Sequence, residues 1–272
     1  MVNIKIILSL VSFTIILISG CGSDNSVNQG GNPASSYNKI LTAESGVNKF
    51  ELWSSTGTAL MYGYNEIGIK AYQNGVEKTS GIVNYNTTMY HGLGGPSHTT
   101  PVKEDFIFDA ATGFFKGYVI FIMYDTAAFW AADYYYNNEF GIDSSVFPLE
   151  FNSLSQILVW DNTVTQRVYI LTLLSSLSPI LGLNELKVML HETSGFQIYN
   201  ELHSADMFIR PQMISTGQSS DNNTNPVYLG DGVYKGTVNF TLPGEWYVYD
   251  SIKYNGTVIT KSPPPKFKFT VN

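Results

Sequence analysis

The sequence predicts an all-β protein with two tandem immunoglobulin-like antiparallel β-sandwich domains. The first observation is an internal repeat. Residues 63–67 (GYNEI) match residues 182–186 (GLNEL), and residues 113–117 (GFFKG) match residues 232–236 (GVYKG). The two copies lie about 119 residues apart, which is the length of one small domain, so the repeat indicates two domains in series and not a solenoid of short units.

The second observation is an apolar pattern with a period of two residues, which is typical of strands. Residues 114–123 are apolar at nearly every position, which predicts a strand buried on both faces or one that lies in a sandwich interior. Their counterparts at 233–242 alternate cleanly between apolar and polar side chains. That alternation predicts a strand with one buried face and one solvent-exposed face.

The third observation is the spacing of turn dipeptides. Asn74-Gly75, Asp231-Gly232 and Asn255-Gly256 are examples of signals that interrupt the strand pattern at intervals of about 8–15 residues. Short strands without alternating helical segments favour an antiparallel sandwich over a parallel α/β fold.

The N-terminal segment resembles an export signal. Residues 1–20 contain one cation, then a mostly apolar run over residues 6–18, then small residues directly before Cys21. This order is similar to a bacterial lipobox, which predicts a lipoprotein signal peptide over 1–20 and lipidation of Cys21. The apolar run is shorter than the ~20 residues that a spanning helix needs. We therefore expect a lipid-anchored protein of the bacterial cell envelope, with the outer membrane favoured.

The remaining chain divides into three predicted parts. Residues 21–37 are rich in Gly, Ser and Asn, which predicts a flexible tether. Residues 38–150 form the first predicted sandwich and residues 151–272 the second. Cys21 is the one cysteine of the chain, so no intrachain disulfide supports either domain. The net charge of −7 argues against a nucleic-acid partner.

A methionine and two histidines suggest a metal site in the first domain. Met89, His91 and His98 lie within a glycine-rich stretch, and thioether with imidazole ligands suits copper. The alternative is an ordered polar loop in which Met89 fills the core and the histidines bond locally. The matching stretch of the second copy begins with Met207 in the place of Met89, and it offers weaker candidates: His203, Met207 and Met213.

Aromatic runs offer a different kind of site. Tyr134, Tyr135 and Tyr136 form a candidate surface for sugars or protein partners. Strand alternation assigns at least half of these rings to the core. Trp130 and Trp246 occupy equivalent positions in the two copies, which favours a shared packing role.

Motifs of common enzymes are absent from the sequence. It contains no G-x-S-x-G nucleophile elbow, no Walker loop, no dinucleotide fingerprint and no H-E-x-x-H zinc motif. Carboxylates such as Glu66 and Asp109 remain free to meet in space, but their spacing does not single out a pair. We therefore expect a protein that is not an enzyme.

These residues resemble the YtkA-like family of exported immunoglobulin-like domains. The shared pattern is G-x-N-x-aliphatic, then a methionine-rich loop, then an ending at residues 232–246 with the order G-x-aromatic-x-G and F-x-aliphatic-x-G-x-W. The first copy keeps Gly63, Asn65, Met89 and His91 but replaces the Pro-Gly turn of the ending with residues 123–128. The resemblance covers nearly all of residues 38–272 and implies copper handling at the envelope.

The leading functional hypothesis is a noncatalytic, lipid-anchored envelope protein that binds a ligand or a protein partner. Copper is the most specific ligand that this hypothesis offers. The alternatives are a cell-surface adhesion or glycan-binding module that uses exposed aromatics, and a structural component of the envelope. The sequence does not identify the ligand.

Overall fold

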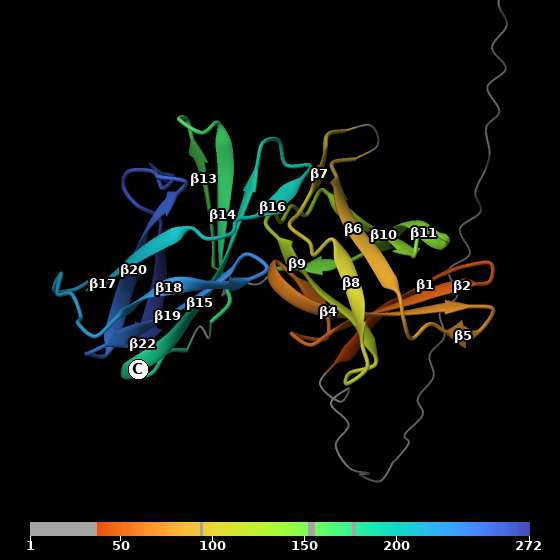
Figure 1. Cartoon of the computed structure of the whole chain (residues 1–272), viewed down its shortest axis with the longest axis horizontal. Helices are drawn as coiled ribbons and strands as arrows, with labels where there is room; N and C mark the ends of the chain where they lie inside the picture. The colour runs from red at the N-terminus through yellow and green to blue at the C-terminus, as the bar shows by residue number, and fades with distance from the viewer. Residues whose placement is uncertain (1–36, 93–94, 152–155, 176–177) are drawn as a thin grey trace, which may run out of the picture. The chain divides into compact units, whose positions relative to one another are not determined.

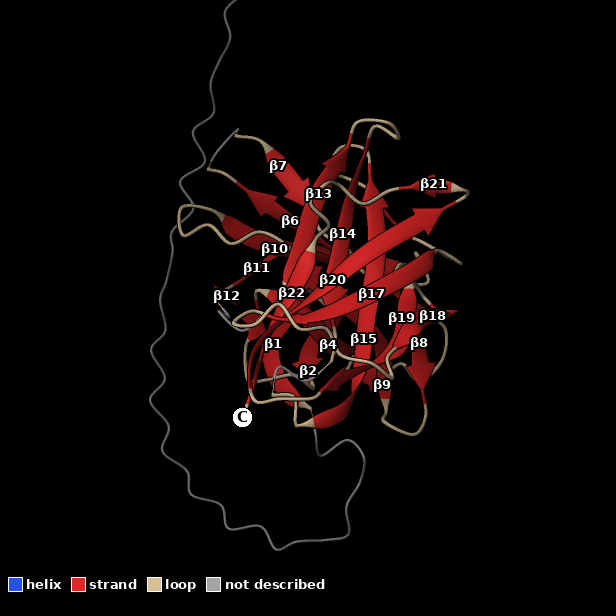
Figure 2. Cartoon of the chain, turned by 90° about the vertical axis from the view of Figure 1, so that its left-hand side faces the viewer, coloured by secondary structure: helices blue, strands red, loops and turns tan. Residues whose placement is uncertain are grey.

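The computed structural model describes residues 37–92, 95–151, 156–175 and 178–272, and every regular element within these ranges is a strand. Figure 2 shows this composition directly. The prediction of an all-β fold is confirmed. The predicted signal peptide, the lipidation of Cys21 and the tether up to residue 36 lie outside the described residues.

No helix in the described part of the chain is long and apolar enough to cross a membrane. Tyr37, which the sequence assigns to the tether, belongs to the fold. Its side chain is buried, its hydroxyl donates to Glu66 Oε1 at 2.8 Å, and its ring centroid lies 4.8 Å from that of Phe114.

The second half of the chain forms two antiparallel sheets. One has the order β13-β14-β15-β19-β18, and in the other β20 pairs with β17, β21 and β22. The strands β14, β15, β19 and β18 therefore stand in the order A-B-E-D, and β17, β20 and β22 in the order C-F-G, which defines a constant-type immunoglobulin sandwich. Its strands are β13 (Ile157–Asn162), β14 (Arg167–Leu173), β15 (Gly182–Thr193), β16 (Tyr199–Glu201), β17 (Asp206–Met213), β18 (Thr224–Gly230), β19 (Val233–Phe240), β20 (Gly244–Tyr254), β21 (Thr257–Val258) and β22 (Lys266–Val271).

The first half repeats this order in one continuous sheet, β1-β2-β4-β9-β8-β6-β10-β11. Here β2, β4, β9 and β8 correspond to A-B-E-D, and β6, β10 and β11 to C-F-G. A short pairing between β6 and β8 joins the two groups, and β11 contacts β1 and β2, so the sheet closes over its own core. Its strands are β1 (Asn38–Ser45), β2 (Asn48–Ser54), β3 (Leu60–Met61), β4 (Gly63–Gln73), β5 (Val76–Glu77), β6 (Ile82–Tyr90), β7 (Ser97–Thr99), β8 (Asp105–Asp109), β9 (Phe114–Phe121), β10 (Phe129–Tyr136), β11 (Phe140–Phe147) and β12 (Leu149–Glu150).

Each half has its own sheets and its own hydrophobic core. Figure 1 shows the strands in two groups, and among the described residues every β-ladder stays within one group. In both cores a tryptophan packs its ring edge-on against a phenylalanine: Trp130 against Phe121 at 4.8 Å and Trp246 against Phe240 at 5.6 Å. The described residues from 37 onward nevertheless form one compact unit, so the boundary near residue 150 stays a prediction.

The repeated G-x-N motif is a backbone clamp. Asn65 accepts from the N–H of Met61 at 2.9 Å and donates to the carbonyls of Met61 and Gly63 at 2.8 and 2.9 Å. Asn184 makes the same three bonds to Ile180 and Gly182. The glycine in each clamp has a φ of 109° or 96°, which a side chain would strain.

Replacing Asn65 with alanine is expected to lower the free energy of unfolding by about 2–4 kcal/mol. The change leaves three backbone groups without their side-chain partner. Two of the three bonds are only partly buried, so the total cost lies toward the low end of what three fully buried unpaired groups, at about 1–3 kcal/mol each, would lose. Asn184→Ala is the matched control, and a smaller loss is expected because Asn184 is only half-buried. Urea titration of both variants measures the difference, and an equal loss in both would contradict the role of burial.

The outer face of β9 explains why the two copies differ in sequence. Tyr118 and Ile120 on that face, with Ile122 directly after the strand, pack with Ile170 and Met189 from β14 and β15 of the second sandwich. The strand is therefore buried on both faces, as predicted. The counterparts of these three residues in the second copy are Thr237, Asn239 and Thr241, which are not buried.

Polar contacts surround this apolar joint. The Tyr118 hydroxyl donates to Glu201 Oε1 at 2.5 Å and lies 3.0 Å from His191 Nε2. Burial lowers the pKa of His191 to about 3, so its imidazole stays neutral at physiological pH. Lys103 Nζ lies 2.8 Å from Asp231 Oδ2 and adds an ion pair between the two halves.

Candidate functional site: a split between two strands

The predicted copper ligands of the first domain do not form a metal cluster. Met89 is buried in the first core, where it pairs with Trp130 across the β6–β10 ladder. The rings of His91 and His98 lie 5.5 Å apart, and His91 Nδ1 lies 3.4 Å from Asp125 Oδ2. The described residues bring together no group of three His, Cys, Asp or Glu side chains. Copper binding here stays an unsupported prediction.

The candidates of the second domain are also dispersed. His203 Nδ1 is hydrogen-bonded to the Tyr228 hydroxyl on the surface, and Met207 is buried in the second core. Strand register corrects the match between the two methionine loops: Met213 pairs with Trp246 as Met89 pairs with Trp130. The residue aligned with Met89 by sequence, Met207, lies six positions earlier in β17.

The predicted tyrosine surface is wrong for two of its three members. Tyr134 and Tyr136 have exposed fractions of 0% and 7%, because both point to the core side of β10. Tyr135 lies on the opposite face, where its hydroxyl donates to Asp143 Oδ1. The alternation of buried and exposed side chains predicted for residues 134–136 is therefore confirmed. A single tyrosine on the outer face does not form an aromatic binding surface.

The structure instead places a pocket where two strands of the first sandwich separate. The β10–β11 ladder ends at the pair Trp130 and Phe147. Pro148 follows and has no N–H to donate, so the ladder cannot continue in its regular pattern. The chain then crosses to β3, where β12 pairs in parallel and the Tyr62 N–H donates to the Glu150 carbonyl at 2.8 Å.

The second sandwich lacks this separation. There β22 remains paired with β20 through Phe269 and Trp246 and on to Val271 and Gly244. Thr270 stands at the position of Pro148 and keeps its N–H. The split, and the pocket that it opens, are therefore specific to the first copy.

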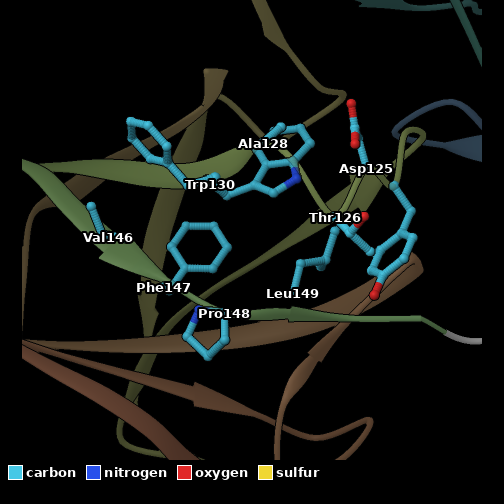
Figure 3. Close-up of a pocket in the computed structure, with 10 residues that line it drawn as sticks. Asp125, Thr126, Ala128, Trp130, Val146, Phe147, Pro148 and Leu149 are labelled. Atoms are coloured by element: carbon cyan, nitrogen blue, oxygen red, sulfur yellow. The ribbon is translucent and has the colours of Figure 1, made fainter. Parts of the chain in front are cut away.

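The pocket has a volume of about 470 Å³ and a mixed lining. Figure 3 shows Trp130, Phe147 and Leu149 around the same space, with Asp125 and Thr126 to one side. Two further rings of the lining are accessible: Tyr124 is 41% exposed and Phe129 is 39% exposed. The ring of Phe129 stacks on that of Tyr90 at 5.3 Å, which supports it from behind. The lining consists of Tyr124, Asp125, Thr126, Ala128, Phe129, Trp130, Val146, Phe147, Pro148 and Leu149.

The indole of Trp130 supplies a free donor to this pocket. Its Nε1–H donates no hydrogen bond to any residue of the described chain, although the side chain is almost completely buried. The counterpart Trp246 donates to the Leu242 carbonyl at 2.9 Å. The two copies also differ before this tryptophan: the first has the longer connection 122–128 in place of the short Pro243-Gly244 turn.

Asp125 supplies an acceptor beside the rings. Its Oδ1 accepts from the Ala127 N–H at 2.8 Å, which fixes the side chain in a local turn, and its Oδ2 faces His91. The pocket thus combines aromatic faces, an indole donor and a carboxylate acceptor. This combination suits a ligand with an apolar face and hydroxyl groups, because each kind of contact has a partner on it.

The sequence assigned Trp130 a packing role and showed that residues 123–128 replace the Pro-Gly turn, but it did not place a pocket there. It missed Tyr124 and Asp125. The signal that could have located the pocket is Pro148 at the end of a strand pattern, since proline cannot donate to a ladder.

No protein-family model and no curated protein sequence matches the chain. The resemblance to the YtkA-like family therefore stays a prediction. Among solved structures, the chain is similar to the Escherichia coli adhesin FdeC, with 11% identity, a TM-score of 0.26, and coverage of 85% of this chain and 66% of that one.

Two further solved structures are similar to the chain at the same level. They are fibronectin type III-like modules of Clostridium thermocellum CbhA, with 10% identity, a TM-score of 0.23, and coverage of 78% of this chain and 87% of that one, and domains 5–6 of the S-layer protein SbsC, with 12% identity, a TM-score of 0.26, and coverage of 86% and 97%. The immunoglobulin-like assignment rests on the strand order described above.

Proposed function

We propose that this chain is a noncatalytic, exported binding module whose first sandwich takes a saccharide-like ligand in the pocket between β10 and β11. The proposal includes a lipid anchor at Cys21 that holds the protein on the bacterial envelope, with the outer membrane favoured. The observation that carries the ligand class is the unbonded indole N–H of Trp130 inside an aromatic pocket, beside the Asp125 carboxylate.

A saccharide has a chemical group to match each of these contacts. The axial C–H groups of a sugar ring form an apolar face that packs on exposed rings such as those of Tyr124 and Phe129. Its hydroxyls both donate and accept, so one hydroxyl accepts from the indole and another donates to Asp125. A pocket of about 470 Å³ has the size of a site for a small ligand or for one or two units of a polymer.

The test is saccharide binding by the full-length protein in detergent. A glycan array selects the ligand, and calorimetry measures its affinity for the wild type and for Trp130→Phe. The variant keeps an aromatic ring in the core but removes the donor, so we expect affinity to fall about 5–10-fold, the worth of roughly one hydrogen bond.

Trp246→Phe is the matched control. It removes the same N–H from a tryptophan whose donor already bonds within the protein, so saccharide affinity is expected to stay unchanged. Absence of saturable saccharide binding to the wild type, or an equal loss of affinity in both variants, would refute the proposed site.

A further inference from the structure

One sheet edge is covered in the first sandwich and uncovered in the second. In the first copy, β12 lies parallel to β3, with Leu149 opposite Leu60 and Glu150 opposite Met61. The Asn65 clamp holds Met61 from the other side. The segment directly before β4 is therefore bonded on both sides.

The corresponding segment before β15 is residues 179–181, with Pro179, Ile180 and Leu181 in the places of Leu60, Met61 and Tyr62. The Asn184 clamp holds Ile180 in the same way, so the backbone is already fixed in the receiving geometry. No strand covers its other side among the described residues, because β22 stays on β20.

Both the backbone and the side chains of this edge are open. The Leu181 N–H, which matches the Tyr62 N–H that donates to Glu150, makes no hydrogen bond with the described residues. Ile180 and Leu181 are 68% and 48% exposed, and Leu242 on the neighbouring connection is also exposed. Their counterparts Met61, Tyr62 and Met123 are all partly buried.

We propose that residues 179–181 accept an extended peptide strand from a partner protein, in the parallel register that β12 adopts on β3. The partner's chemistry follows from the occupant of the equivalent edge. It is a segment with apolar side chains at alternate positions, like Leu149 and Phe151, and with a free carbonyl at the residue between them to accept from Leu181. Pro179 has no N–H, but this pairing does not need one at that residue. The Asn184 clamp bonds to Ile180, and an added strand would donate to the carbonyl of Pro179.

A bound strand would cover the apolar side chains of this edge, which are otherwise exposed to water. An open edge with unpaired backbone groups and apolar side chains is a site for strand addition, and proteins normally shield such edges when they have no partner. Here Ile180 and Leu181 carry no charge and no β-bulge protects them. The proposal does not depend on the saccharide pocket, which lies in the other sandwich.

The experiment measures hydrogen exchange of backbone amides in the full-length protein with and without a peptide. The probe is an acetylated, amidated peptide with the sequence of residues 146–151 (VFPLEF) at about millimolar concentration. We expect the exchange of the Leu181 amide to slow at least about 10-fold, since a ladder bond protects an amide that is otherwise open. The Tyr62 amide serves as the internal control and is expected to be unaffected.

Two controls distinguish strand addition from non-specific hydrophobic binding. A peptide N-methylated at the residue after its glutamate keeps the acceptor carbonyl and is expected to bind, whereas N-methylation of the glutamate itself removes a ladder donor and is expected to weaken the protection. Leu181→Pro removes the receiving N–H and is expected to abolish binding, whereas Leu181→Ala retains it. Circular dichroism confirms that both variants fold.

The proposal is overturned if the Leu181 amide is unaffected by the peptide, or if a scrambled peptide protects it equally. It is also overturned if that amide is protected without peptide in a manner that depends on protein concentration, because the occupant would then be a second copy of this chain.

Discussion

Replacing Ile120 with alanine is expected to lower the free energy of unfolding by about 2–5 kcal/mol, the range for truncating a buried isoleucine. Ile120 is fully buried on the outer face of β9, where it packs against the second sandwich rather than within the first core. An outer-face residue of a single sandwich would normally face water, so this cost arises from the joint between the two halves.

The matched control is Asn239→Ala, the same position in the second copy. Asn239 is half-buried and donates to the Asp221 carbonyl at 3.0 Å, so its loss is expected to cost about 1 kcal/mol or less. Urea unfolding followed by tryptophan fluorescence gives both values. Hydrogen exchange at Met189 adds a local readout, since loosening of the joint should raise exchange there in Ile120→Ala alone. Equal costs for the two variants would contradict a buried joint.

Replacing Asp250 with valine is expected to raise the free energy of unfolding at neutral pH by about 1–3 kcal/mol, the typical cost of a buried polar group without a partner. Asp250 is fully buried on the core face of β20, and neither carboxylate oxygen has a hydrogen-bond partner among the described residues. Burial raises the pKa of this carboxyl well above its usual value of 3.8.

The sign of the pH dependence follows from that raised pKa. Below about pH 3.8 the carboxyl is protonated in both the folded and the unfolded state, so it has no titration effect on stability. As the pH rises above that value, the unfolded chain releases the proton while the folded chain retains it. Ionisation then favours unfolding, and stability falls until the pH passes the folded-state pKa.

Urea titrations between about pH 3 and pH 8 test this expectation. The advantage of Asp250→Val over wild type should grow as the pH rises from 4 and shrink toward pH 3. Asp250→Asn is the control for titration alone: it should remove the same pH slope but gain less, because its amide remains buried without a partner. A destabilised Asp250→Val at neutral pH would show that the carboxylate has a role that the fold requires.

The fold was predictable because its signals are local and repeated. The alternation in 233–242 correctly indicated a strand with one free face. The largely apolar stretch 114–123 indicated a strand buried on both faces or in a sandwich interior, and the structure shows the first. The G-x-N motif marked the start of equivalent strands because the clamp requires asparagine and a glycine with positive φ. These properties depend on residues close in the chain.

The candidate site was less predictable because it depends on which strand pairs with which. Pro148 ends one ladder, but the sequence does not say that the chain will next pair with residues 60–61. The misalignment of Met207 with Met89 has a similar cause, since register is fixed by cross-strand partners such as Trp246 and Trp130. A burial pattern alone also could not show that the indole of Trp130 lacks the bond that Trp246 makes.

The joint between the sandwiches uses a different surface on each copy. The second copy presents Ile170 and Met189 to its neighbour, whereas the first copy has Lys49 and Lys70 at those two positions, paired with Glu51 and Glu77. The receiving face of the first copy is apolar, and that of the second is polar at Thr237, Asn239 and Thr241. The two copies therefore present complementary surfaces to each other: apolar side chains of the second copy pack on an apolar face of the first, whereas the equivalent surface of each copy on its other side is polar.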